Sequence, residues 1–322
     1  MSLLRRLRAT AQLLHRPGVH TPFEVVRHLL AVQAQDLRSA RLAVRARTRE
    51  CKANDVNRAL DEGELVVAWL LRGTLHLVTR DDYWWLQCLT APTRAAANRR
   101  RLKEEGIDAT AADRAVGIIG DALAGQGPLT RDELAEIVSA QGIRTAGQAM
   151  PHLLMLTVLR GVTVMGPLRK DGTLAFVLAH DWLGPPRPID RDAAVRELGR
   201  RYVAAHPRST PDDLAHWAGI AVSDARQSFA AVKNHDGNHL DPQPVPERLL
   251  PAFDPYLLGW RDRSFAVPPP LAKDVHPGGG VIRPAATRDG EVVGTWALRR
   301  GQVHAPECFI AEAEDVRRFH CG

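Results

Sequence analysis

The chain has few cysteines and no long apolar run, and each shortage excludes a class of protein. Its four cysteines stand far apart in 322 residues, without the paired spacing of a disulfide framework or a zinc site. No apolar run reaches the roughly 18 residues of a membrane span. The first residues predict an amphipathic helix with arginines, not a secretory signal. We expect a cytoplasmic, nucleoid-associated protein with reduced thiols, no metal and no membrane partner.

Common catalytic signatures are also missing. The sequence has no P-loop, no His-Glu-x-x-His zinc motif and no Gly-x-Ser-x-Gly nucleophile elbow. His235 and His239 are separated by a predicted hairpin turn at Asp236-Gly237, which disfavours metal binding by two turns of one helix. Lysine is scarce as well, since Lys52 and Lys103 are the only two in the first 110 residues. The sequence therefore predicts no cofactor and few candidates for a lysine nucleophile.

The positive charge is concentrated in one part of the chain. The net charge is +6, and residues 1–110 hold 19 lysines and arginines against 12 aspartates and glutamates. The remaining residues hold 24 against 25. A basic first third favours a polyanionic partner such as DNA. For a single cluster, such as residues 99–101, the solvated face of an arginine-rich helix is the more ordinary explanation.

Three stretches repeat one order of predicted elements. Each contains a helix that opens with a threonine cap and an acidic residue three positions later, at Thr21, Thr130 and Thr210. Each then leads to a predicted β-hairpin, at residues 65–78, at 162–178 around Asp171-Gly172, and around Asp236-Gly237. Helix, turn, helix and two-stranded wing is the order of a winged helix. We interpret the repetition as three tandem winged-helix units.

The last part of the chain changes character. Strands are predicted over 245–253, 280–286, 291–299 and 302–310, with a turn at Asp289-Gly290 and a final helix over 312–319. This pattern indicates a small β-rich, barrel-like domain. The fold class is therefore α+β, with three winged-helix units over 1–109, 110–184 and 185–244, followed by a C-terminal domain over 245–322.

Two glutamines flank one alanine at the end of the first capped helix, in Gln33-Ala34-Gln35-Asp36. Residues two apart share a face only when the chain is extended. If both glutamine side chains contact the same group, this stretch is extended. Taken alone the motif is weak, because polar residues at a helix end are ordinary.

Two longer motifs lie in the C-terminal part. One is the stretch 249–263, and the other runs from 280 to 296. Together with Gln33-Ala34-Gln35-Asp36 and Arg72-Gly73-Thr74-Leu75-His76, in the same order, they make the chain similar to the AlkZ-like winged-helix DNA glycosylases. This bacterial family removes N7-alkylated purines and unhooks DNA interstrand crosslinks. The resemblance spans about residues 3–310.

The resemblance implies a fold, a substrate and a catalytic pair. In the family, tandem winged helices and a β-rich domain form a C-shaped, basic DNA cleft. A Gln-apolar-Gln motif is catalytic, and that role carries over to Gln33 and Gln35. Some relatives have aspartate at the second position, so Gln35 places the chain with the crosslink-unhooking type. We expect a monomer whose partner is double-stranded DNA bearing alkylated purines or crosslinks.

Glutamine suits this reaction although it cannot act as a general base. A purine alkylated at N7 is already cationic, so it departs without a general acid. The remaining tasks are to hold a water near C1′ and to direct carbonyl dipoles at the developing oxocarbenium ion. The predicted enzyme is monofunctional. Asp36 is the competing carboxylate, and we expect its side chain on the opposite face.

Several other residues are secondary candidates. Arg72 and His76 have two interpretations. In the first they hold a phosphate or orient a glutamine. In the second they are structural, as a capped strand and a histidine whose hydrogen bonds are satisfied within the fold. Arg261 and Arg263 contact DNA, or they pair with aspartates of their own domain at 254 and 262. The predicted DNA-binding residues are Arg38, Arg41, Arg45, Arg72, Arg261 and Arg263. Two other functions fit the sequence: a non-catalytic winged-helix regulator, and a self-resistance protein that sequesters a DNA-alkylating natural product.

Overall fold

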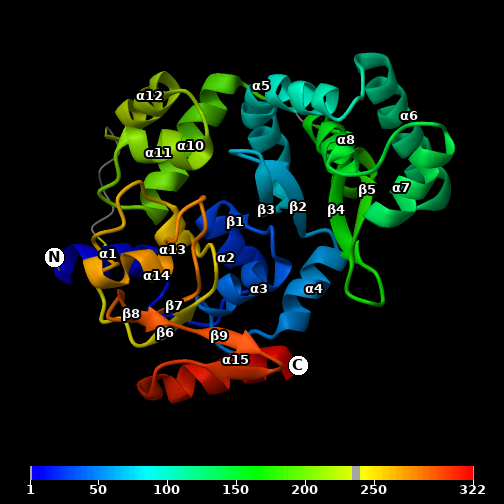
Figure 1. The fold of residues 1–322 in the computed structure, drawn as a ribbon. Coiled ribbons are helices and arrows are strands. Elements are labelled where there is room, and N and C mark those ends of the chain that lie inside the picture. The colour runs from blue at the N-terminus through cyan, green and yellow to red at the C-terminus, as the bar shows by residue number, and fades with distance from the viewer. Residues whose placement is uncertain (1, 187, 234–239, 322) are drawn as a thin grey trace. The chain divides into compact units, whose positions relative to one another are not determined.

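The computed structural model describes residues 2–186, 188–233 and 240–321. It combines helices and small antiparallel sheets, as expected for an α+β protein (Figure 1). Its internal contacts define two compact units. Unit 1 joins Met1–Val56 to Val195–Gly322, and unit 2 is Asn57–Ala194. The segment 57–109 thus packs within unit 2, while the division into four domains stays a prediction.

The first part of unit 1 consists of α1 (Ser2–Ala11), α2 (Pro22–Leu29), β1 (Val32–Gln33) and α3 (Leu37–Arg45). Helix α2 begins where the sequence predicts. The Thr21 hydroxyl accepts from the Glu24 amide, and the Glu24 carboxylate accepts from the Thr21 amide. These two bonds satisfy donors that a helix start leaves open. The helix then buries one apolar face, formed by Val25, Val26 and Leu29.

After unit 2, the chain re-enters unit 1 through three helices. They are α10 (Arg191–Ala205), which begins at the unit boundary, α11 (Pro211–Ala218) and α12 (Val222–Lys233). Thr210 caps α11 with Asp213, as predicted, and α11 packs on α12. The predicted turn at Asp236-Gly237 and the two flanking histidines lie outside the described residues.

The C-terminal part of unit 1 contains two small sheets. Strands β6 (Arg248–Leu250), β7 (Ala285–Arg288) and β8 (Glu291–Thr295) form one, and β9 (Ala297–Arg299) and β10 (Gln302–His304) form the other. Trp296 separates β8 from β9, because its buried indole turns inward and donates to the Leu250 carbonyl at 2.6 Å. The single strand expected over 291–299 is therefore wrong, because β8 and β9 lie in different sheets, and the barrel-like form of the domain stays a prediction.

Short helices complete this part of unit 1. They are α13 (Pro255–Leu258), the 3₁₀ turn η1 (Pro269–Leu271), α14 (Ala272–Val275), the 3₁₀ turn η2 (Glu307–Phe309) and α15 (Ile310–Cys321). Helix α15 packs on α3, β6 and β10. The last helix of the chain thus supports the helix that follows the glutamine motif.

Unit 2 is built on an antiparallel sheet in the order β3-β2-β4-β5. Its strands are the two predicted hairpins, β2 (Leu65–Leu70) with β3 (Thr74–Thr79), and β4 (Thr163–Leu168) with β5 (Leu174–Leu178). The helices are α5 (Arg80–Glu104), α6 (Ala109–Gln126), α7 (Arg131–Ala140), α8 (Ala149–Leu159) and α9 (Ala179–Leu183), while α4 (Ala53–Asp61) joins the two units.

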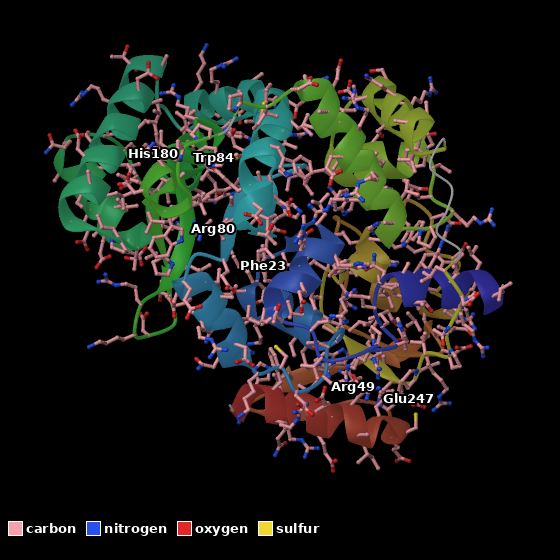
Figure 2. All side chains as sticks on the ribbon, turned by 180° about the vertical axis from the view of Figure 1, so that it is seen from behind. Phe23, Arg49, Arg80, Trp84, His180 and Glu247 are labelled. Carbon is pink, nitrogen blue, oxygen red and sulfur yellow. The ribbon has the colours of Figure 1, made fainter. Side chains whose placement is uncertain are left out.

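Local signals fix the starts of α6 and α7 in unit 2, at Asp108 and Thr130. Thr130 and Glu133 form the predicted capping box of α7. Pro151 falls in the first turn of α8 and not in the helix interior, so its missing N–H removes no helical hydrogen bond. Trp84, labelled in Figure 2, donates from its indole to the Gly184 carbonyl at 3.2 Å and so joins α5 to the end of α9. In the described part of the chain, no helix is long and apolar enough to cross a bilayer.

Two buried histidines make stability depend on pH. Burial lowers the pKa of His76 from 6.5 to about 4 and that of His206 from 6.5 to about 3. The unfolded chain therefore takes up these protons at a higher pH than the folded chain. Between pH 7 and pH 5 each histidine should remove about 2 kcal/mol from the free energy of unfolding. Thermal denaturation should show a lower midpoint at pH 5 than at pH 7.

The comparison of pH 7 with pH 8 is the control for this prediction. Both histidines are neutral there in the folded and the unfolded chain, so they contribute almost no change. An equal midpoint at pH 5 and pH 7 would contradict the burial of neutral imidazoles at these positions.

Candidate active site

The glutamine motif is an extended link between two capped helices. Helix α2 ends at Leu29, and Leu30 turns the chain with a φ of 69° and a ψ of −48°. Strand β1 follows, and Asp36 caps α3 with extended backbone angles. The expectation of an extended motif is therefore met at Gln33, whereas the backbone bends at Gln35 and Asp36. A non-glycine residue in this region of backbone space is strained, so the packing around the buried Leu30 side chain must hold the turn in place.

The two glutamine side chains contact each other. Nε2 of Gln33 donates to Oε1 of Gln35 at 2.6 Å. The Gln33 side chain is buried, with 5% of the residue exposed, whereas Gln35 is exposed. The spacing of two thus places both amides on one side of the extended link, as the motif requires if they act together.

The carbonyl oxygen of Gln33 is an exception among buried polar atoms. Oε1 is shielded from solvent and has no hydrogen-bond partner in the described part of the chain. Buried acceptors are nearly always bonded, and an orphan calls for an explanation such as a bound water or a role in chemistry. This oxygen can accept a hydrogen bond from a water, or it can direct its dipole at a positive charge.

Asp36 has a different task from the glutamines. Its carboxylate accepts from the amide of Arg38 at 3.1 Å, from the amide of Ser39 at 3.3 Å and from the Ser39 hydroxyl at 2.7 Å. These bonds satisfy the first open donors of α3. Ser39, which was not predicted, therefore helps to hold the carboxylate against the helix. This geometry favours Asp36 as a helix cap over Asp36 as a catalytic base.

Three arginines of α3 were predicted to bind DNA, and the structure separates them. Arg38 is exposed in the first turn, and Arg41 is half-buried one turn later. Arg45 is only 1% exposed. The prediction for Arg45 is wrong, because α15 covers this end of α3 and supplies acidic partners for the guanidinium.

Those partners form a buried ion cluster. Arg45 contacts Asp315 at 2.8 Å and Glu312 at 3.1 Å, and it donates to the Leu249 carbonyl at 2.8 Å. Arg16 and Arg248 also contact Glu312, at 3.1 Å and 3.3 Å. Burial alone would raise the pKa of Glu312, but the three guanidinium groups hold it below its usual value. Glu312 is therefore ionised at neutral pH and fixes α15 beneath α3.

Arg72 and His76 belong to unit 2. Burial and the nearby Arg94 lower the pKa of Arg72, which still stays a cation at neutral pH. His76 is fully buried, and its Nδ1 lies 2.8 Å from the Thr74 carbonyl. With a pKa of about 4 the imidazole is neutral at pH 7 and donates that bond. This favours the satisfied-histidine interpretation of His76 over a phosphate-holding cation.

The arginines of the 249–263 motif were expected to contact DNA or to pair with Asp254 and Asp262. Asp254 instead binds Arg47 through two bonds of 2.7 Å and 2.9 Å, with both side chains fully buried. Asp262 accepts from the amide and hydroxyl of Ser264. The predicted pairing through Asp254 is therefore wrong. Arg47 was not predicted, since only the three-dimensional fold brings the turn after α3 to this motif.

The two arginines themselves differ in exposure. Arg261 is exposed, while Arg263 is half-buried and donates from Nε to the Leu257 carbonyl at 2.7 Å. Arg261 therefore presents its charge to solvent, and Arg263 helps to close the loop that follows α13.

The site contains polar groups without a titrating base of its own. One hydrogen bond joins the side-chain amides of Gln33 and Gln35. The carbonyl oxygen of Gln33 is buried and has no hydrogen-bond partner among the described residues. The carboxylate of Asp36 caps α3. Among the described residues, no group of three histidine, cysteine, aspartate or glutamate side chains is arranged to hold a metal ion. Such an arrangement can position water and stabilise a cation through fixed dipoles, which act strongly in a site of low dielectric.

The chain is similar to known DNA glycosylases. The family described as "DNA glycosylase AlkZ-like" matches residues 26–305, which include the glutamine motif. An interstrand DNA cross-link repair glycosylase of Streptomyces sahachiroi is 26% identical over 309 residues, covering 85% of this chain and 81% of the relative. The solved structure of Streptomyces sahachiroi DNA glycosylase AlkZ has a TM-score of 0.79 at 23% identity, covering 99% of this chain and 96% of that structure.

Proposed function

The chain belongs to the AlkZ-like family of DNA glycosylases, and we propose that it excises N7-alkylated purines and unhooks DNA interstrand crosslinks. In this proposal water attacks the sugar, and Gln33 and Gln35 organise the attack. The curated relative from Streptomyces sahachiroi is named for crosslink repair, which supports the choice of substrate.

The glutamine pair is the observation that carries the proposal. A hydrogen bond of 2.6 Å fixes the two amides relative to each other and leaves the buried Gln33 carbonyl oxygen open. The helix caps at Thr21 and Asp36 hold the extended link from both ends. Pre-organised dipoles of this kind need no reorganisation when charge develops, which is the main source of their catalytic effect.

The proposed substrate explains why amides suffice. Alkylation at N7 makes the purine cationic, so the glycosidic bond breaks without protonation of the leaving base. The sugar then acquires oxocarbenium character, and the Gln33 carbonyl dipole stabilises that charge. The Gln35 amide orients the attacking water, whose oxygen forms the new bond to C1′ while the N9–C1′ electrons leave with the base and neutralise its charge. The proton that the water loses passes to the solvent. The expected products are free modified base and an intact abasic site.

The DNA-binding elements are part of the same proposal. Helices followed by hairpins, as in α6-α7-α8-β4-β5 of unit 2, follow the order of a winged helix, and we propose three such units in tandem. Arginines that solvent can reach supply sequence-independent affinity for phosphates. The candidates that keep this role are the exposed Arg38 and Arg261 and the half-buried Arg41, Arg72 and Arg263.

The direct test is incubation of the protein with a duplex that contains one N7-methylguanine. We expect release of free N7-methylguanine, with strand cleavage at the abasic site only after heat or alkali. Borohydride added during the reaction should trap no covalent protein–DNA adduct, because the nucleophile is water and not an amine. Chromatography of the released base and gel analysis of the strand provide both measurements.

An undamaged duplex of the same sequence is the control for this experiment. Binding of both duplexes without base release would favour the regulator, especially if affinity depended strongly on sequence. A trapped adduct would show an amine nucleophile and would contradict the monofunctional mechanism.

A further inference from the structure

A basic hollow lies in the C-terminal part of unit 1, on residues other than those of the glutamine site. Its volume is about 530 Å³, within the roughly 300–1,000 Å³ of small-molecule sites. The lining comes from the segment before β7, from the β8–β9 junction and from the β9–β10 hairpin (Figure 1). The lining residues are Arg283, Pro284, Thr295, Trp296, Ala297, Arg299 and His304.

Strand register explains why the hairpin directs its polar groups into one place. Ala297 lies opposite His304, and Arg299 lies opposite Gln302. Residues two apart on a strand share a face, and so do residues directly opposite each other. Arg299 and His304 therefore project from the same face of the hairpin, with Ala297 between them. The small side chain of Ala297 leaves the space that a larger residue would fill.

The floor of the hollow is rigid. Trp296 is 5% exposed, and its Nε1 donates to the Leu250 carbonyl at 2.6 Å. The backbone amide of Arg283 donates to the Val275 carbonyl at 2.9 Å, which fixes the start of the opposite wall. The cationic side chains thus extend from backbone that is held by the core of unit 1.

The charge of the lining has one sign. Arg283 and Arg299 are exposed cations, His304 adds a ring N–H, and none of the described lining residues is acidic. The Arg283 side chain donates to the Asp274 carbonyl at 3.4 Å, a long hydrogen bond that leaves most of the guanidinium donors available. Guanidinium groups match the geometry of phosphate oxygens and bind them through paired hydrogen bonds.

We propose that this hollow binds a backbone phosphate of the DNA duplex, as an anchoring contact separate from the glutamines. The assignment rests on the proposed DNA substrate, because the chemistry of the hollow specifies a phosphodiester and the function supplies the polymer. Arg299 and Arg283 hold the phosphate oxygens, and Thr295 and Trp296 form the surface beside the sugar. The contact positions the duplex and carries no sequence information.

The hairpin offers a matched pair of variants for the test. Arg299→Gln removes a charge inside the hollow, whereas Arg300→Gln removes the same charge one residue away, outside its lining. Both positions are exposed, so both variants should fold like the wild type. Affinity for an undamaged duplex is measured between 50 and 200 mM salt. Arg299→Gln should lower the log–log salt slope by about 0.9, so that it loses about 3.5-fold less affinity over this range than the wild type.

Arg300→Gln should leave the slope nearly unchanged, and Arg283→Gln should lower it as Arg299→Gln does. Equal slopes for the variants at 299 and 300 would overturn the proposal. A second result would also overturn it: Arg299→Gln weakens tight binding of a nucleoside monophosphate but leaves the salt slope of duplex binding unchanged. The hollow would then bind free nucleotides and not the duplex.

Base release from the N7-methylguanine duplex is measured with the same proteins, so that the two proposals fail separately. Equal slopes together with normal base release would remove the phosphate site and leave the glycosylase function intact. A lower slope for Arg299→Gln without base release by the wild type would support the phosphate contact and contradict the proposed reaction.

Discussion

Replacing Gln33 or Gln35 with alanine is expected to slow release of N7-methylguanine by about 10²–10³-fold, the usual cost of removing one pre-organised dipole from a transition state. Gln33→Ala removes the buried carbonyl oxygen, and Gln35→Ala removes the group that fixes Gln33 at 2.6 Å. Because the two amides act as a unit, the double variant should be only slightly slower than the slower single variant. Single-turnover base release measures all three rates.

Two further variants separate this mechanism from a carboxylate mechanism. Gln35→Glu keeps an acceptor for Nε2 of Gln33 and should retain more activity than Gln35→Ala. Asp36→Asn keeps the side-chain oxygen that caps α3, so it should fold normally and remain active. The assignment of the glutamines would be wrong if Asp36→Asn were inactive while Gln35→Ala kept its rate. Affinity for an undamaged duplex is the control, and none of these changes should alter its salt slope.

Features specified by neighbours in sequence were predictable. The capping boxes at Thr21, Thr130 and Thr210 are present because each needs only four consecutive residues. The hairpins of unit 2 follow from short apolar runs that flank tight turns. The extended backbone at Gln33 was predicted from the spacing of two in the glutamine motif. In each case the interactions that determine the structure are made between residues close together in the sequence.

Features that depend on distant partners were not predictable from the pattern. Arg38, Arg41 and Arg45 are equivalent by helical spacing, yet Arg45 is buried and contacts acidic residues of α15, about 270 positions later in the chain. Asp254 has arginines close in sequence, but its buried partner is Arg47. Charge alone does not show whether an arginine faces solvent or an ion pair. That choice is made by tertiary packing.

Breaking the buried Arg47–Asp254 pair is expected to destabilise unit 1 strongly. Asp254→Ala removes both bonds to the guanidinium and the cap that binds the Tyr256 amide at 2.9 Å. It leaves a buried cation with only neutral acceptors, the Ala43 carbonyl and the Gln12 amide oxygen. Breaking a buried pair in this way costs about 3–5 kcal/mol. The thermal midpoint of unit 1 should therefore fall by roughly 10 °C.

A double-mutant cycle distinguishes the loss of a partner from the value of the pair itself. Arg47→Met fills similar space without charge, so Arg47→Met with Asp254→Ala should be less destabilised than the sum of the two single variants. Strict additivity would show that the two side chains do not interact in the folded protein. At a temperature where Asp254→Ala remains folded, its rate of base release should approach that of the wild type. A folded but inactive Asp254→Ala would instead place this carboxylate in the chemistry, because a purely structural pair acts only through the folded fraction.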